Sequence, residues 1–351
     1  MANKIGNNTG DLSSLTKDQL WEMEQAKLGK KGEIFFILKS LLPILGLAVS
    51  ILEYVLVPNK YGNQHPERYI IFLIVPVVIY CIRWIITRIQ YQKGNRQGFI
   101  KVAGKAPFLF VLHLAFAVFD YLTLKTGILL YPFIPWINDI INAMILDRAQ
   151  LLKCAIASIK LLFTGYFAGV ALGIITGIAC GYSEKINYWI NPILKVLGPI
   201  PTATWIPLIM IIAKSLKGGS IFIIGLGTWF MVTVATRTGI SNVDRAYYDV
   251  ARTLGAKERQ LVFSVAIPHA MPNILQGMTQ GMSSACVSLM IAEMMGVKAG
   301  LGWYITWSTA WAAYNKMFAA IIIICITFSV VTKALDMIKN YLLRWQIGVT
   351  K

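Results

Sequence analysis

Long apolar blocks separated by short polar segments dominate the chain. A bilayer core needs about 20 consecutive, mostly apolar residues per helix, and the blocks of that length predict about eight transmembrane helices. Their approximate ranges are 34–57, 69–91, 107–126, 151–182, 193–213, 219–240, 272–297 and 317–340. The pattern therefore predicts an all-α polytopic membrane protein. Between the third and fourth spans, a proline-containing amphipathic run predicts a short helix lying along the outer surface.

The composition agrees with a membrane protein. The 351 residues are 56% hydrophobic and only 14% charged, whereas soluble domains carry about 25% charged residues. We interpret the net charge of +17 as basic loops facing anionic lipid. A nucleic-acid surface is disfavoured, because no platform of aromatic and basic side chains accompanies the charge. The five cysteines form no CxxC pair, so we expect no metal site and no disulfide framework.

Basic residues gather in alternate loops. Clusters precede the first span, follow the second, follow the sixth and close the chain: Lys27, Lys30 and Lys31; Lys93, Arg96, Lys101 and Lys105; Arg245, Arg252, Lys257 and Arg259; Lys339, Arg344 and Lys351. With eight spans, all four clusters lie on one side of the membrane. Because cytoplasmic loops are enriched in Lys and Arg, we expect both termini to be cytoplasmic.

A glycine recurs at every fourth position of the fourth span. The positions are Gly165, Gly169, Gly173, Gly177 and Gly181. Residues four apart share one helix face, and small residues let helix backbones approach closely in lipid. The groove predicts either close packing against another helix or a seam along which helices slide.

The fifth predicted span begins with four prolines within sixteen positions, in "NPILKVLGPIPTATWIPL". Proline removes a backbone donor and breaks helix geometry, and broken backbone at membrane depth is tolerated when it is buried or lines a cavity. This segment is therefore either an irregular, cavity-lining helix start or a kinked packing helix.

A charged stretch interrupts the apolar pattern between the sixth and seventh spans. In "SNVDRAYYDVARTLGA", Val243, Ala246, Tyr247, Val250, Ala251 and Leu254 follow the spacing of one helical stripe. Ser241, Asn242 or Asp244 can cap the start of this helix, and Gly255 can end it in the left-handed conformation. We expect a second short helix to follow and to stop at Pro268.

This stretch resembles the cytoplasmic signature of the permease subunits of bacterial ABC importers. That signature reads Glu-Ala-Ala, three residues, Gly, nine residues, then Ile-x-Leu-Pro. Here Asp249-Val250-Ala251, Gly255 and Val265-Ala266-Ile267-Pro268 stand at the same intervals. The strings "GPIPTATWIPL" and "PHAMPNILQGMTQGMSSACVSLMIAEMMG" look like the nitrate, sulfonate, taurine and bicarbonate branch. The resemblance covers about residues 108–346.

The resemblance implies a domain organisation. Residues 1–33 form a cytoplasmic extension, residues 34–105 add two transmembrane helices and a basic loop, and residues 106–346 form a six-helix type I permease core. Residues 242–268 become coupling helices that dock on a cytoplasmic ATPase. The residues that the resemblance assigns to coupling are Tyr247, Asp249, Val250, Ala251, Arg252, Leu254 and Gly255.

The resemblance also implies a function and partners. The chain is expected to be a non-catalytic subunit that moves a small solute, such as a sulfonate, taurine, nitrate or bicarbonate, across the bacterial cytoplasmic membrane by alternating access. Its expected partners are an ABC ATPase dimer, a periplasmic or extracellular solute-binding protein, a second copy of the permease and lipid, with no nucleic acid. ATP and Mg²⁺ are expected on the ATPase, because this chain has no G-x-x-x-x-G-K-[ST] loop.

Candidate residues of the translocation pathway are Pro201, Trp205, Met290 and Glu293. An intramembrane carboxylate is a functional candidate by default, but Glu293 lies near the end of its span. A solute contact, a gate and a structural hydrogen bond therefore all remain possible. His113 and Asp120 lie seven residues apart, on one helix face, and we interpret them as forming buried hydrogen bonds.

Two other classes of function compete with an importer subunit. An ion-coupled secondary transporter needs no ATPase, but it commonly shows repeated halves, and none is visible here. A membrane-embedded enzyme needs a cluster of catalytic side chains. The three histidines, His65, His113 and His269, are scattered along the chain and supply none.

Overall fold

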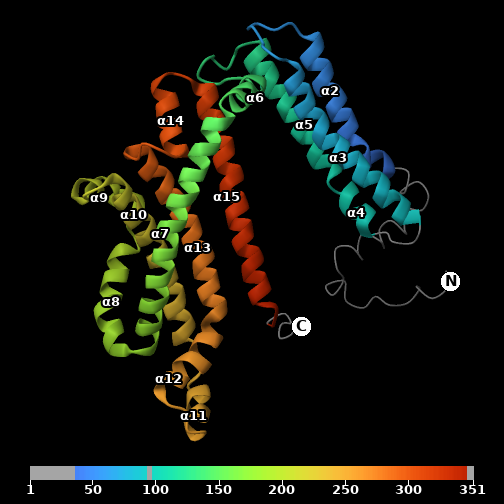
Figure 1. Cartoon of the computed structure of the whole chain (residues 1–351). Helices are drawn as coiled ribbons and strands as arrows, with labels where there is room; N and C mark the ends of the chain where they lie inside the picture. Colours follow the sequence, from blue (N-terminus) through green and yellow to red (C-terminus); the bar gives the residue numbers. More distant parts are fainter. Residues whose placement is uncertain (1–35, 93–96, 346–351) are drawn as a thin grey trace, which may run out of the picture. The chain divides into compact units, whose positions relative to one another are not determined.

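The computed structural model describes residues 36–92 and 97–345 (Figure 1). Over those residues the chain forms helices and loops and no strand, so the predicted all-α class is confirmed. The predicted cytoplasmic extension, 1–33, lies outside the described residues, as do the basic residues Lys93 and Arg96. The chain divides into two units, residues 1–142 and 143–351.

The first unit is a small helical bundle. Its elements are α2 (Leu42–Leu56), α3 (Glu67–Gln92), α4 (Gln97–Ala103), α5 (Ala106–Asp120), the π-helical turn η2 (Tyr121–Lys125) and the beginning of α6 (Ile137–Leu146). Aromatic rings fill its core, where Tyr54, Tyr69 and Trp136 are buried with Leu73 and Leu124. The buried His113 imidazole contacts the carbonyl oxygens of Leu109 and Leu73, at 2.7 and 3.2 Å, which links α5 to α3 as expected. The hydrogen bond expected of Asp120 is wrong, because its buried carboxyl group has no hydrogen-bond partner among the described residues.

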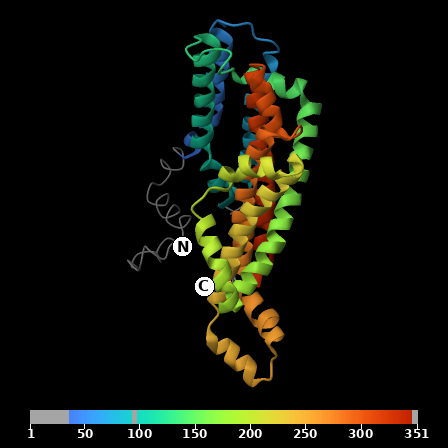
Figure 2. The ribbon, with the colours of Figure 1, turned by 90° about the vertical axis from the view of Figure 1, so that its left-hand side faces the viewer.

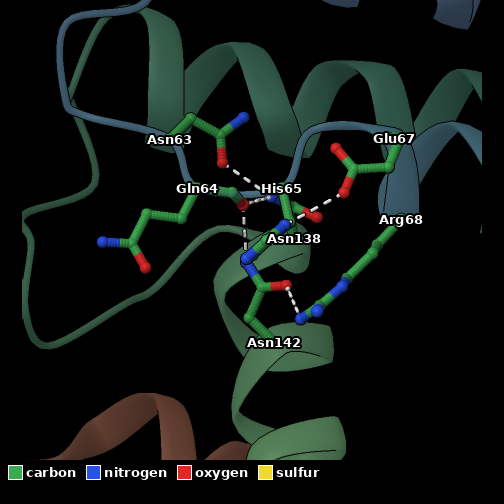
Figure 3. Close-up of polar contacts among 7 residues, drawn as sticks. All are labelled: Asn63, Gln64, His65, Glu67, Arg68, Asn138 and Asn142. Atoms are coloured by element: carbon green, nitrogen blue, oxygen red, sulfur yellow. Dashed lines mark hydrogen bonds and ion pairs between the residues drawn. The ribbon is translucent and has the colours of Figure 1, made fainter.

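The loop between α2 and α3 is fastened to α6 by amide side chains (Figure 3). The Asn138 amide donates to Asn63 Oδ1 and to the Gln64 carbonyl, each at 2.7 Å. Asn142 donates to the same carbonyl and accepts from Arg68 Nη1, at 2.7 Å in both cases. The predicted short helix between the third and fourth spans therefore exists, and its first half belongs to the N-terminal unit.

The second unit carries the longer helices. They are α7 (Arg148–Tyr182), α8 (Glu184–Leu197), η3 (Thr202–Trp205), α9 (Ile206–Ile212), α10 (Leu216–Ser241), α11 (Arg245–Thr253), α12 (Glu258–Gln260), the π-helical η4 (Leu261–Ala266), α13 (Ile267–Met295), α14 (Leu301–Ala310) and α15 (Tyr314–Leu342). Side chains of α7, α10 and α13, with Val331 of α15, form its main core. Figure 2 shows α11 and α12 projecting from one end of this bundle.

The glycine groove of α7 packs against α10 along its whole length. A Cβ added at Gly169 would lie 2.5 Å from the Gly225 carbonyl oxygen, and one added at Gly177 would lie 2.5 Å from Thr236 Cβ. The contacts at Gly165, Gly173 and Gly181 are equally close, against Ile224, Val232 and Ile240. The β-branched side chains of α10 therefore fill the groove against the α7 backbone, and the two backbones come closest where Gly169 faces Gly225.

The expected count of eight spans is not confirmed. Among the described residues, five helices are long and apolar enough to cross a membrane, or six if one bent pair counts as a single span. The helix α2 has 15 residues, about 22 Å at 1.5 Å per residue, which is short of a bilayer core. The helix α13 has 29 residues, but its polar side chains, such as Gln276 and Gln280, lower its hydropathy.

The fifth predicted span, 193–213, is not one helix. The segments Glu184–Leu197 and Thr202–Ile212 meet at an angle of 89°, because Pro199 and Pro201 interrupt the backbone hydrogen bonds between them. The expectation of an irregular segment at this place agrees with the structure, and the bend lies within the predicted span.

The packing boundary of the structure does not coincide with the predicted domain boundary near residue 105, which stays a prediction. The helix α5, which we expected to open the core, packs against α2 instead, where Gly46 lies against Phe110 and His113. The packing boundary falls after Asn142, because the polar contacts of α6 tie the intervening segment to the N-terminal helices.

The seam between α7 and α10 generates a stability prediction. Gly169→Ala places a methyl group against backbone that cannot move aside, so we expect the free energy of unfolding to fall by about 1–3 kcal/mol. Thermal unfolding of the detergent-solubilised protein measures the loss. Gly98→Ala is the matched control, because a Cβ there meets only ordinary contacts at 3.6 Å and beyond. Equal melting temperatures for both variants would contradict the close packing of α7 against α10.

Candidate functional site

The charged stretch forms a helical hairpin whose boundaries are set by local chemistry. The Asp244 carboxylate caps α11 by accepting from the Ala246 amide at 3.0 Å. The helix ends at Gly255, whose φ of 82° is in the left-handed region that favours glycine. The amides of Gly255 and Ala256 donate back to the carbonyls of Arg252 and Ala251, at 2.9 and 3.0 Å, which is the Schellman pattern.

The apolar stripe of α11 faces away from the protein. The side chains of Tyr247, Val250 and Leu254 are 59%, 60% and 83% exposed, and only Val243, before the helix, is buried. Apolar residues gathered on a protrusion outside the bundle are typical of an interaction surface. We call Tyr247, Val250 and Leu254 the hairpin face.

Ionic contacts hold the hairpin in shape. Arg252 lies 3.7 Å from Asp249 and 3.5 Å from Glu258, so one guanidinium joins α11 to α12. The Glu258 carboxylate accepts from the phenol of Tyr182 at the end of α7. The ring of Tyr182 packs edge-on against Tyr248, with ring centroids 6.2 Å apart. The orientation of the hairpin is thus linked to α7.

The second helix of the hairpin does not stop at Pro268 as we expected. The helical backbone runs from Glu258 through η4 into α13 without a break, and Pro272 also lies inside that helix. The π-helical turn Leu261–Ala266 explains the difference, because its wider backbone relieves the clash that a proline ring makes with the preceding turn. The hairpin is therefore the end of a long helix.

A cavity of about 410 Å³ lies where the broken helix meets α10 and α13. The predicted pathway residues Pro201 and Trp205 line it. Other side chains that line it include Thr202, Phe230 and Met231, together with the polar group Gln280, Ser283 and Ser284 of α13. Aromatic walls with a few neutral hydrogen-bonding groups suit a small ligand.

The other two predicted pathway residues do not line this cavity. Met290 packs beside the cluster that includes Leu151 and Tyr304. Glu293 is 0% exposed and accepts hydrogen bonds from the Ser158 hydroxyl at 2.7 Å and from the Gly302 amide at 2.8 Å. It is thereby held in a closed socket between α7 and the start of α14.

Comparison with known proteins identifies the family. A family model described as the binding-protein-dependent transport system inner membrane component matches residues 169–346, just over half of the chain. The chain belongs to this family. The match includes the hairpin, the cavity and Glu293 itself, whereas Ser158 of the socket precedes it.

Two relatives and one solved structure illustrate the range of similarity. The permease is 31% identical over 141 residues to a putative ABC transporter permease protein of Methanocaldococcus jannaschii, covering 38% of this chain and 53% of that protein. It is 32% identical over 182 residues to the putative aliphatic sulfonates transport permease protein SsuC of Bacillus subtilis (strain 168). That alignment covers 52% of this chain and 66% of that protein. A chain from a structure of inward-facing conformations of the MetNI methionine ABC transporter matches with 18% identity and a TM-score of 0.47. That match covers 56% of this chain and 97% of the other. The permease thus aligns with roughly half to two thirds of the two relatives' length.

The socket around Glu293 fixes the beginning of α14. Gly300 precedes this helix with a φ of 121°, and a Cβ there would collide with the Glu293 carboxyl group. The Leu301 amide donates to the Ser158 hydroxyl at 2.9 Å. A carboxyl group beside the first amides of a helix is favourable, because the helix dipole is positive there.

A second polar contact holds α14 from the side. The Asp147 carboxylate accepts from the Tyr304 hydroxyl at 2.6 Å and pairs with Lys316 Nζ at 2.8 Å. Partial burial acts to raise the pKa of Asp147, but the hydrogen bonds from Lys316 and Tyr304 outweigh it and hold the pKa below its ordinary value. The permease thus anchors α14 both at its start and along its side.

Sequence reasoning missed several of these residues. Gln280, Ser283 and Ser284 share one face of α13 at helical spacing. This polar face could have been recognised in the sequence, because it lies in an otherwise mostly apolar segment. Ser158 and Tyr182 carried no such signal, because their partners, Glu293 and Glu258, lie far along the chain.

The socket generates a prediction that separates structure from solute binding. Glu293→Ala leaves the buried Gly302 amide without an acceptor, which costs about 1–3 kcal/mol. We therefore expect the variant to unfold at a lower temperature even without solute or partner proteins. Ser158→Ala should also lower the unfolding temperature, because it breaks the same hydrogen-bond network from the side of α7. If both variants unfold at the native temperature but solute uptake is lost, Glu293 contacts the solute instead.

Proposed function

We propose that this permease is the transmembrane subunit of an ATP-driven importer. In this proposal it moves a small solute from a binding protein across the bacterial cytoplasmic membrane by alternating access. The observation that carries the proposal is the hairpin face, a set of exposed apolar side chains on a charged protrusion at the end of a long helix. The family membership supports it.

The partner that the hairpin face fits is a cytoplasmic ABC ATPase. The hairpin carries Arg245, Arg252, Lys257 and Arg259, and loops enriched in Lys and Arg usually face the cytoplasm. An apolar centre surrounded by charged side chains is the usual composition of a protein interface. ATP and Mg²⁺ would bind to the ATPase, and the permease itself would carry out no catalysis.

Assembly as a closed two-fold complex follows from the number of hairpins. Each permease offers one hairpin, whereas a dimer of ATPases offers two equivalent grooves, and closed symmetry is the common solution for such assemblies. We therefore propose two copies of this chain, two ATPases and one solute-binding protein on the outer side, with both permease termini in the cytoplasm.

The cavity beside the broken helix is the proposed solute passage. Its polar groups are neutral hydroxyls and an amide, on Thr202, Ser283, Ser284 and Gln280, so it can pass a small polar solute without holding it tightly. A sulfonate, taurine, nitrate, bicarbonate or similar compound is the proposed cargo. The relative named for aliphatic sulfonates supports this class.

The partner assignment is tested by charge substitution on the hairpin face. Leu254→Glu and Val250→Glu place a carboxylate at the centre of the proposed contact, so we expect at least a tenfold loss of co-purifying ATPase with unchanged folding. Ser241→Glu, exposed at the base of the hairpin, is the control and should retain the ATPase. Failure of the native chain to retain any protein with an ATP-binding G-x-x-x-x-G-K-[ST] motif would argue against the importer.

A second test concerns the angle between the two hairpin helices. Gly255 has no atom within 4 Å of an added Cβ, so Gly255→Val strains only the backbone, by about 1–3 kcal/mol. We expect the subunit to fold and insert while ATP hydrolysis no longer drives solute uptake in reconstituted vesicles. Gly255→Asn is the matched control, because asparagine tolerates the left-handed conformation. Equal uptake by both variants would show that the angle does not matter.

A further inference from the structure

The N-terminal unit contains a buried group of titratable side chains that has no part in the function proposed above. Asp120 at the end of α5 is 0% exposed, and Glu53 of α2 is partly buried. All four of their carboxyl oxygens are shielded from solvent and have no hydrogen-bond partner among the described residues. Lys125 of η2 lies close enough to interact electrostatically with both.

The ammonium group of Lys125 is fully occupied by other acceptors. It donates to the carbonyl oxygens of Tyr54 and Val57, at 2.6 and 2.8 Å, and to Asn59 Oδ1 at 2.7 Å. Three acceptors require three N–H donors, which only the charged ammonium possesses. Lys125 therefore carries a positive charge but has no hydrogen left to donate to either carboxyl group.

The charges in this pocket do not balance if both acids are ionised. Two carboxylates face one ammonium, which leaves one uncompensated negative charge in an apolar core of aromatic rings. The other titratable groups that face the pair are the phenols of Tyr54 on α2 and Tyr69 on α3, which are neutral. A buried charge without a partner is costly, and a carboxylate in that position takes up a proton instead.

We propose that Glu53 and Asp120 together bind one proton, making the N-terminal unit a proton-binding site separate from the transport core. The ligand is a proton and not a metal ion, because the ammonium of Lys125 repels a cation. The described residues also bring together no group of three or more His, Cys, Asp or Glu side chains that could hold a metal. The proposal does not depend on the identity of the transported solute.

Charge balance makes the site testable by infrared spectroscopy of the purified full-length protein at neutral pH. A protonated carboxyl group and an ionised carboxylate give separate bands. Either Asp120→Asn or Glu53→Gln leaves one acid opposite Lys125, so we expect each variant to lose one protonated carboxyl per chain. If one of the two does not fold, the other still supplies the measurement. Lys125→Met removes the balancing charge and should add one protonated carboxyl.

The control variant and the contradicting result also concern the number of protonated carboxyl groups per chain. Asp336→Asn changes a half-exposed carboxylate that pairs with Lys339, and it should remove an ionised band only. If Asp120→Asn and Glu53→Gln also remove only ionised bands, the native pair holds no proton and the proposal is wrong. Because ATPase binding is measured separately on the hairpin variants, this result would leave the importer function unaffected.

Discussion

Close packing of α10 into the glycine groove of α7 is the constraint on which the second unit depends. In a bilayer, apolar side chains gain little by leaving lipid for another helix, so association relies on close packing. Glycine at every fourth position removes one whole row of side chains from α7, and α10 occupies the space. Polar contacts add to this seam, since the hydroxyl of Thr176 contacts Thr233 Oγ1 and accepts from the Trp229 indole, at 2.8 and 3.0 Å.

The seam determines where the hairpin is presented. Gly181 lies against Ile240, so α7 and α10 end side by side, and α11 begins four residues after α10 ends. Tyr182, the last residue of α7, then binds Glu258 of the second hairpin helix. These contacts join the hairpin to the end of the seam.

One long helical run connects the three candidate regions of the second unit. It begins in the hairpin at Glu258, passes the cavity at Gln280, Ser283 and Ser284, and reaches the socket at Glu293. The hairpin, the cavity wall and the contact with α14 are thus parts of one continuous helical run. The π-helical turn at Leu261–Ala266 is the irregular part of that run, a feature often found at functional sites.

Buried carboxyl groups have opposite surroundings in the two units. Glu293 has hydrogen-bond donors from Ser158 and Gly302, whereas Glu53 and Asp120 have none among the described residues. From the sequence alone, each of these acids is simply a carboxyl residue within an apolar segment. Which donors meet it depends on residues that are far away along the chain, so only packing separates a structural carboxylate from a proton-binding one.

The sequence by itself determined the features that local chemistry controls. Apolar block length specified long helices, the period of four specified a flat face on α7, and Asp244 and Gly255 specified the start and end of α11. Each of these depends on neighbours within a turn or two. The tertiary structure decided that the apolar stripe of α11 faces outward and that α5 packs with the N-terminal helices. It also decided that the second hairpin helix continues through Pro268. It also decided that Glu293 is enclosed while Trp205 lines a cavity. These outcomes depend on contacts between distant segments, because the same apolar or charged side chain is stabilised differently by lipid, by protein and by a neighbouring helix end.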